Sequence, residues 1–172
     1  MDELVHQSEG RAVREGRSVS ETKPAVEIRL LSDPMYLAGA RELVLGLTRR
    51  LGFRQDESGR IALAVDEALA NVINHGYGRQ LDKPIWMSIW PNAKPGVPGL
   101  RIVVEDEAKQ IDPDTICGRD LDDIKPGGLG VHIIKEVMDS VVYERREKVG
   151  MRLIMTKALT PKPTSAREHA NG

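Results

Sequence analysis

Cysteine is almost missing from this sequence, which contains a single one, Cys117. One thiol cannot form an intrachain disulfide, and it does not supply the paired cysteines of a zinc site. Aromatic residues are also scarce, with one phenylalanine, two tryptophans and three tyrosines. Because cysteine-poor chains suit a reducing compartment, we expect a cytoplasmic protein in which Cys117 is a packing residue.

The sequence also lacks an excess of charge and a long apolar run. It has 25 Lys and Arg residues against 26 Asp and Glu residues, whereas nucleic-acid-binding domains are usually strongly basic. No apolar run approaches the roughly 18 to 20 residues that cross a membrane, and the N-terminus lacks the order of a signal peptide. We therefore expect no direct nucleic-acid partner and no membrane contact.

The 172 residues are enough for one domain with a sizeable core. Residues 1–23 are polar and without periodicity, and residues 159–172 form a second polar segment that contains prolines. Both compositions are typical of flexible segments, so we predict one folded domain over residues 24–158.

Apolar periodicity predicts the secondary structure of this domain. Helices are expected at residues 34–51, 55–75 and 131–138, and strands at residues 25–31, 84–90, 99–106, 140–146 and 151–156. Residues 107–128 form a long irregular region, which is typical of a lid or a binding loop. Short turns join neighbouring strands, and three helices can cover one face of such a sheet. We predict an α+β two-layer sandwich with a mixed, mainly antiparallel sheet covered on one face by helices.

Two polar side chains lie one turn apart in the second predicted helix. Glu67 and Asn71 have the four-residue spacing that places side chains on one face, opposite a core stripe of apolar residues. A carboxylate can accept a proton, and an amide oxygen can bind a hard cation such as Mg²⁺. A sparsely polar, solvated helix face would explain the same pair.

Two further features could complete a site for a phosphorylated ligand. The glycines at 127, 128 and 130 open a helix, where free N–H groups and the helix dipole favour a phosphate, although glycine-rich turns before helices are common. Asp106 ends a predicted strand and could accept a hydrogen bond from a purine amine. It could equally cap the loop that follows.

Trp86 and Trp90 alternate with Ile85, Met87 and Ile89 along one predicted strand. If the aliphatic side chains face the core, the tryptophans mark an exposed contact surface; the opposite orientation fits the pattern equally well.

The order of these motifs resembles the Bergerat (GHKL) ATP-binding fold of gyrase, Hsp90, histidine kinases and MutL. Within it, the chain is most similar to the anti-sigma-factor serine kinases of the RsbW and SpoIIAB kind. Three strings carry the resemblance, DEALANVINHGY at residues 66–77, GGLGVHIIKEVMD at 127–139 and GMRLIMTK at 150–157. It extends over residues 25–157 and implies an ATP-binding kinase domain.

The resemblance implies roles for individual residues. Glu67 would be the general base that activates a serine hydroxyl, Asn71 would ligate Mg²⁺, and Asp106 would bind the adenine amine. Other positions implied to contact ATP are His75, Ala108, Lys125, Gly127, Gly128, Leu129 and Gly130. A solvated lysine in a loop, without contact to ATP, would also explain Lys125.

The implied function is that of an anti-sigma factor and ATP-dependent protein serine kinase. Its partners would be a sigma factor and an anti-anti-sigma protein of the STAS type, and a homodimer is possible. One motif departs from the pattern, because the usual Asp-x-Gly-x-Gly box has Ala108 and Gln110 in place of its glycines. This departure motivates one alternative, a non-catalytic or weakly nucleotide-binding regulatory module of the same fold. A separate alternative is a detached ATPase domain of the histidine-kinase type.

Overall fold

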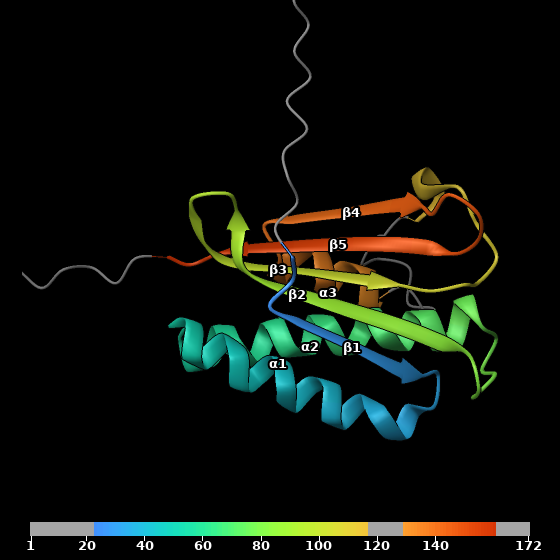
Figure 1. Ribbon diagram of the computed structural model, residues 1–172, viewed down its shortest axis with the longest axis horizontal. Helices are drawn as coiled ribbons and strands as arrows, with labels where there is room; N and C mark the ends of the chain where they lie inside the picture. Colours follow the sequence, from blue (N-terminus) through green and yellow to red (C-terminus); the bar gives the residue numbers. More distant parts are fainter. Residues whose placement is uncertain (1–22, 117–128, 161–172) are drawn as a thin grey trace, which may run out of the picture.

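A computed structural model describes residues 23–116 and 129–160 of the chain (Figure 1). The elements, in order, are β1 (Val26–Leu31), a 3-10 turn (Pro34–Tyr36), α1 (Leu37–Leu51), α2 (Gln55–Asn71), a π-turn (Val72–Gly76), β2 (Pro84–Lys94), β3 (Val97–Glu105), a 3-10 turn (Pro113–Thr115), α3 (Leu129–Val137), β4 (Ser140–Arg145) and β5 (Met151–Ala158). In these ranges no helix is both long enough and apolar enough to cross a membrane.

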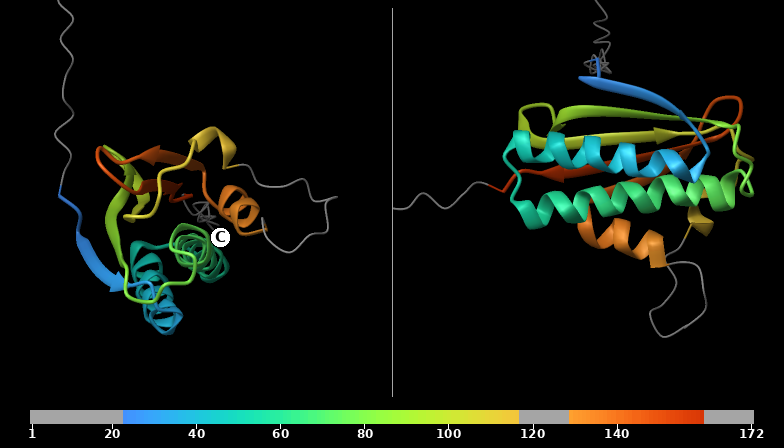
Figure 2. Two further views of the ribbon diagram at one scale, coloured as in Figure 1. Left: turned by 90° about the vertical axis from the view of Figure 1, so that its right-hand side faces the viewer. Right: turned by 90° about the horizontal axis from the view of Figure 1, so that it is seen from below.

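The five described strands form one sheet in the order β1-β2-β3-β5-β4, and every neighbouring pair is antiparallel. The three α-helices lie together on one face of this sheet (Figures 1 and 2). The predicted two-layer α+β sandwich is therefore confirmed. Its sheet is antiparallel throughout the described residues rather than mixed.

Local sequence signals explain where the first two helices begin and end. The Asp33 carboxylate accepts a hydrogen bond from the Met35 N–H at 2.9 Å, which caps the turn leading into α1. Gly52, with φ 98°, terminates α1, because this left-handed conformation favours glycine. At the start of α2 the Glu57 carboxylate accepts from the Arg54 N–H at 3.2 Å.

The core lies between the helices and the covered face of the sheet. On α2 the side chains of Ile61, Val65 and Leu69 are fully buried, as the helical periodicity predicts. On β2 the aliphatic residues face the helices, and Met87 is completely buried. The tryptophans of β2 consequently lie on the uncovered face, which decides between the two orientations that the strand pattern allowed.

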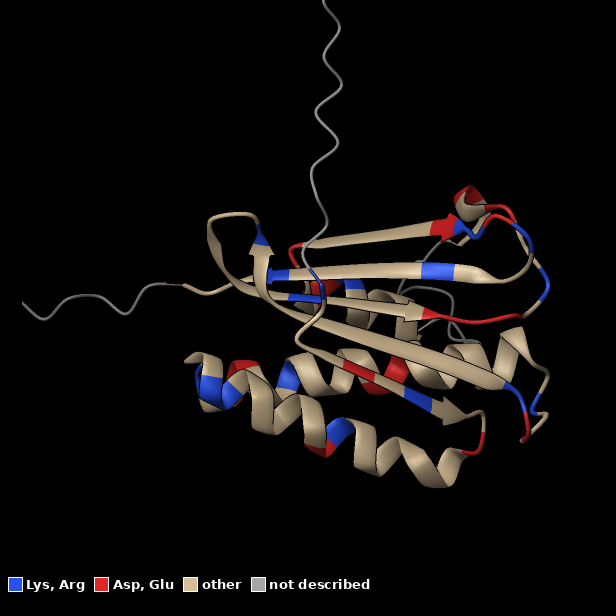
Figure 3. Cartoon of the chain, in the orientation of Figure 1, with Lys and Arg blue, Asp and Glu red and all other residues tan. Residues whose placement is uncertain are grey.

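Arginines lie over these tryptophans on the uncovered face. The guanidinium carbon of Arg101 is 4.0 Å from the centre of the Trp90 ring, and that of Arg146 is 5.2 Å from the centre of the Trp86 ring. Figure 3 shows further acidic and basic positions toward the ends of β3, β4 and β5. The uncovered face is therefore a layer of cation–π contacts and ion pairs.

Two boundaries differ from the sequence prediction by four residues, more than any other. The second helix was expected to reach His75, but α2 ends at Asn71 and a π-turn follows it as far as Gly76. The turn is of the π type because the Tyr77 N–H donates to the carbonyl five residues earlier, that of Val72, at 2.9 Å. The sequence predicted a turn over residues 91–98, between the strands at 84–90 and 99–106. Much of it is strand, because β2 extends to Lys94 with register shifts near Asn92.

Candidate functional site

The start of α3 lies directly against the polar stripe of α2. A methyl group built on buried Gly130 would lie 2.6 Å from Oε2 of Glu67 and 3.4 Å from both polar atoms of the Asn71 amide. Figure 2 shows the two helices side by side. The structure thus brings together three of the residues predicted from the sequence, and the missing side chain at Gly130 makes the close approach possible.

Glu67 and its neighbour Asp66 face different surroundings. Asp66 Oδ2 forms an ion pair with Arg41 of α1 at 3.2 Å, whereas Glu67 faces the backbone of α3. Of these two consecutive carboxylates, Glu67 is therefore the one available for chemistry between α2 and α3.

The Asn71 amide has a polar atom without a partner. Its Nδ2 is buried and makes no hydrogen bond with any described residue. A buried amide without a partner costs about 1 to 3 kcal/mol, so this position is destabilising unless a further group binds there. The amide is thus suited to bind a ligand that enters between α2 and α3.

Asp106 follows the last residue of β3 and is only 5% exposed. Its Oδ1 accepts hydrogen bonds from the Ala108 N–H at 2.8 Å and from the Met151 N–H at 3.0 Å. Its main chain is also held, because the Arg146 guanidinium donates to the Asp106 carbonyl at 2.6 Å. Burial raises the pKa of the Asp106 carboxyl, and the two backbone hydrogen bonds oppose this effect without cancelling it.

The two residues that replace the glycines of the box are packed into the structure. Ala108 is 5% exposed, and a Cβ added to Gly76 would lie 3.1 Å from the Ala108 methyl group. The side-chain amide of Gln110 donates to the Arg146 carbonyl at 2.6 Å. Through these contacts the segment after β3 is held against the π-turn that follows α2 on one side and the β4–β5 hairpin on the other.

The remaining predicted site residues are placed less centrally or are not described. His75 is exposed at the end of the π-turn, and Leu129 is 63% exposed at the start of α3. Lys125, Gly127 and Gly128 lie outside the described residues.

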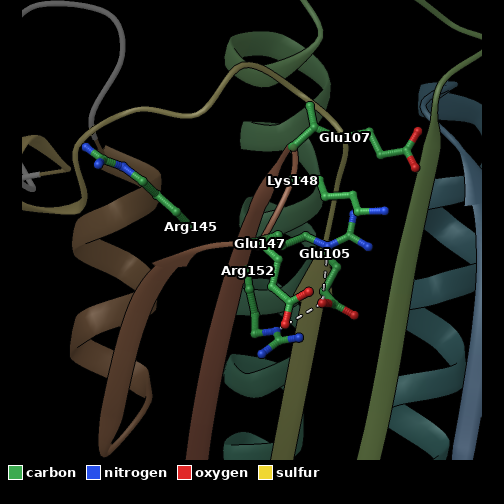
Figure 4. A pocket seen from close by; sticks show the side chains of 8 residues that line it. Glu105, Glu107, Arg145, Glu147, Lys148 and Arg152 are labelled. Atoms are coloured by element: carbon green, nitrogen blue, oxygen red, sulfur yellow. Dashed lines mark hydrogen bonds and ion pairs between the residues drawn. The ribbon is translucent and has the colours of Figure 1, made fainter.

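A cavity of about 490 Å³ lies elsewhere, at the β4–β5 hairpin (Figure 4). Its lining residues are Glu105, Glu107, Arg145, Arg146, Glu147, Lys148, Val149 and Arg152. Glu105 pairs there with Arg152 at 2.9 Å and with Arg146 at 3.4 Å. Because none of the predicted site residues lines this cavity, it is separate from the site between α2 and α3.

Sequence reasoning missed two residues that hold Asp106 and the segment after it. Arg146 was expected only as the end of a strand, and Tyr77 only as the last residue of the string at residues 66–77. The Tyr77 hydroxyl accepts a hydrogen bond from the Glu107 N–H and donates one to the Pro84 carbonyl, each at 2.6 Å. The single signal available was an aromatic residue between two glycines, Gly76 and Gly78.

The fold is that of a class of ATPase domains. The histidine kinase-like ATPase domain family matches residues 30–157, most of the chain, and the chain belongs to this family.

Individual relatives are serine kinases. The serine-protein kinase RsbW of Halalkalibacterium halodurans is 28% identical over 142 residues, which cover 78% of this chain and 83% of that protein. The serine-protein kinase RsbW of Bacillus subtilis is 28% identical over 144 residues, which cover 78% of this chain and 85% of that protein. That of Bacillus velezensis is 24% identical with the same coverage of both chains. The resemblance to RsbW-type kinases is therefore confirmed.

Proposed function

We propose that this protein is an ATP-dependent protein serine kinase and an anti-sigma factor. The observation that carries the proposal is the contact of Glu67 and Asn71 with Gly130, in a family of ATPase domains whose similar members include serine-protein kinases. Its phosphoryl acceptor would be a serine of a STAS-type anti-anti-sigma protein, and its second partner a sigma factor, as the family resemblance implies.

ATP and Mg²⁺ are the proposed cofactors, and the described residues fit them. Nδ2 of the Asn71 amide lacks a hydrogen-bond partner, and Gly130, which has no side chain, lets Glu67 and Asn71 lie close to the α3 backbone. Asn71 would hold Mg²⁺ through its oxygen, and Asp106 would accept a hydrogen bond from the adenine amine. Because Mg²⁺ is usually bound by one or two protein ligands together with phosphates, a single amide is sufficient. When bound, ATP would supply the phosphoryl group, and Mg²⁺ would neutralise part of the negative charge on it.

Glu67 is proposed as the general base. Its carboxylate lies next to the α3 backbone, where it would accept the proton of the acceptor serine and so raise the nucleophilicity of the hydroxyl oxygen. Phosphoryl transfer depends mainly on positioning and electrostatics, so a base and a metal ligand one helical turn apart are sufficient chemistry for this chain.

Transfer of the terminal phosphate of labelled ATP to a purified STAS-type protein tests the catalytic proposal. Glu67→Gln is expected to lower the rate about 10²- to 10⁴-fold, as expected for loss of a general base. Glu136→Gln is the matched control, because it makes the same change on α3, where Glu136 pairs with Arg60 in solvent. Equal rates for Glu67→Gln and the wild type would eliminate the proposed role of Glu67.

A non-catalytic binding module is the second candidate function. The replacement of both box glycines favours it, because Ala108 adds a buried methyl group and Gln110 adds an amide that binds the Arg146 carbonyl. Calorimetry with Mg·ATP separates the two functions. Binding heat together with a raised melting temperature supports the kinase, whereas neither effect at millimolar ATP supports the binding module.

We also propose that the uncovered sheet face mediates a homodimer. Ile154 lies at its centre, opposite Val103 and Val142 in the neighbouring strands, and Trp86 and Trp90 flank this apolar centre. Tryptophan and arginine are the residue types that most often dominate binding energy at interfaces.

Sedimentation equilibrium tests the dimer. The wild type should have twice the monomer mass, and Ile154→Glu should be monomeric because it buries a charge in the interface. Leu63→Glu is the control, since Leu63 is 43% exposed on the helical layer. A monomeric wild type would contradict the proposal.

A further inference from the structure

Tyr77 occupies a junction between three segments that are distant in sequence. It follows the π-turn at the end of α2 and is 7% exposed. The π-turn adds a residue to the last helical turn, and π-turns of this kind occur frequently at functional sites. Here the turn places the Tyr77 ring between the start of β2 and the segment that follows β3.

The Tyr77 hydroxyl makes two hydrogen bonds. It accepts a hydrogen bond from the Glu107 N–H and donates one to the Pro84 carbonyl, both at 2.6 Å. Burial raises the pKa of this hydroxyl, so it stays protonated and keeps its donor at physiological pH. A phenylalanine would fill the same space and lose both hydrogen bonds.

The Glu107 N–H belongs to the turn that orients the Asp106 carboxylate. Asp106 precedes it, and Ala108, whose N–H donates to Asp106 Oδ1, follows it. The opposite side of the turn is held by Met151 and Arg146, so Tyr77 is its support from the α2 side. Without the hydroxyl, the Glu107 peptide would lose its partner, and the Ala108 N–H would no longer be held in line with Oδ1.

We propose that Tyr77 is a positioning residue that determines nucleotide specificity, because it holds the Asp106 carboxylate where it selects a purine with a 6-amino group. This inference rests on the proposed binding of ATP. It predicts that the Tyr77 hydroxyl matters for adenine and not for a 6-oxo purine, which has no amine to donate to the carboxylate.

The test compares the dissociation constants of Mg·ATP and Mg·ITP for the wild type and for Tyr77→Phe. A site built to accept a hydrogen bond discriminates strongly against an analogue that lacks the donor, so the wild type should prefer ATP. In Tyr77→Phe we expect affinity for ATP to fall about tenfold, the equivalent of about 1.4 kcal/mol, and affinity for ITP to change less than about twofold. Tyr143→Phe removes a tyrosine hydroxyl from edge strand β4 and should leave the ATP to ITP ratio unchanged.

Amide hydrogen exchange supplies a readout that is independent of nucleotide. The Glu107 and Ala108 amides should exchange faster in Tyr77→Phe than in the wild type, because the first loses its acceptor and the second its alignment. Unchanged exchange would overturn the inference.

The binding outcomes separate this inference from the proposed function. A wild type that binds neither nucleotide overturns the proposed function and the inference with it. If the wild type prefers ATP and Tyr77→Phe has the same ratio of the ATP and ITP dissociation constants, the inference is overturned and the proposed function is not. An equal loss of affinity for both nucleotides also overturns it, because it would show a general structural effect.

Discussion

Replacing Gly130 with alanine should separate activity from stability at the candidate site. The new methyl group would lie 2.6 Å from Oε2 of Glu67, closer than any ordinary contact. The atom in the way is the end of a flexible side chain, so the Glu67 carboxylate can retreat by about 1 Å through rotation of its own torsions, at a cost of about 1 kcal/mol. The helix gains about 0.5 to 1 kcal/mol, because alanine loses less backbone entropy than glycine on folding.

These terms nearly cancel, so the free energy of unfolding should change by less than about 1 kcal/mol. The loss of activity should be much larger than the loss of stability, because displacement of a catalytic group by about 1 Å can lower the rate about 10²-fold. We therefore expect single-turnover phosphoryl transfer to slow about a hundredfold in Gly130→Ala, while the urea unfolding midpoint remains close to that of the wild type.

Two controls isolate the contact with Glu67. Gly46→Ala makes the same substitution in α1, where an added Cβ meets nothing within 4 Å, and it should leave the transfer rate unchanged. The double variant Gly130→Ala with Glu67→Gln should be no slower than Glu67→Gln alone, because both changes remove the same interaction. A loss of more than about 2 kcal/mol of stability, or a rate within threefold of the wild type, would refute this reasoning.

Three further predictions concern the residues around the site and the sheet. Because the pKa of Asp106 is raised, its protonated form adds stability below the unfolded pKa, and this stability is lost as pH rises through the folded pKa. Urea unfolding at pH 7 should therefore show Asp106→Asn at least as stable as the wild type. Calorimetry should show that the same variant binds ATP more weakly. Burial alone would raise the pKa of Asp139, but its hydrogen bond to Lys157, a second from a backbone N–H and the Lys157 charge lower it overall. The stability that the Asp139 carboxylate contributes is therefore present above about pH 4 and lost as pH falls through the folded pKa. Thermal unfolding should show Asp139→Asn less stable than the wild type by up to about 1 kcal/mol at pH 7, and equally stable in strong acid. Gly150→Ala should cost about 3 kcal/mol or more in urea unfolding, because Gly150 has φ 89° and an added Cβ would collide with the Asp106 backbone; a loss below about 0.5 kcal/mol would contradict this.

Local patterns were sufficient to predict the elements and their layers. Alternation separated the two faces of β2 but left open which face is buried, and the four-residue spacing placed Glu67 and Asn71 on one face of α2. Both are properties of a short segment, because side-chain direction within one element repeats with a fixed period. The order of strands in the sheet is different in kind, since β5 enters between β3 and β4 through pairings that no local period encodes.

The supports of Asp106 could not be predicted for the same reason. Tyr77 and Arg146 reach the segment after β3 from positions 30 and 40 residues away in sequence. Their contacts depend on the π-turn after Asn71 and on the tight β4–β5 hairpin, and both are details of backbone geometry. Local sequence patterns thus indicate candidate site residues, whereas the fold determines which other residues hold them in place.

The replaced glycines of the box are compatible with an adenine site on structural grounds. Asp106 Oδ1 is oriented by backbone N–H groups of Ala108 and Met151, which any residue except proline would supply at those positions. The Ala108 methyl group is accommodated because its neighbour Gly76 has no side chain, and a Cβ there would lie 3.1 Å away. Gln110 turns its amide toward the Arg146 carbonyl and so joins the hairpin. Gly76 in the π-turn thus leaves room for the Ala108 methyl group, and the Asp106 carboxylate keeps both of its backbone hydrogen bonds.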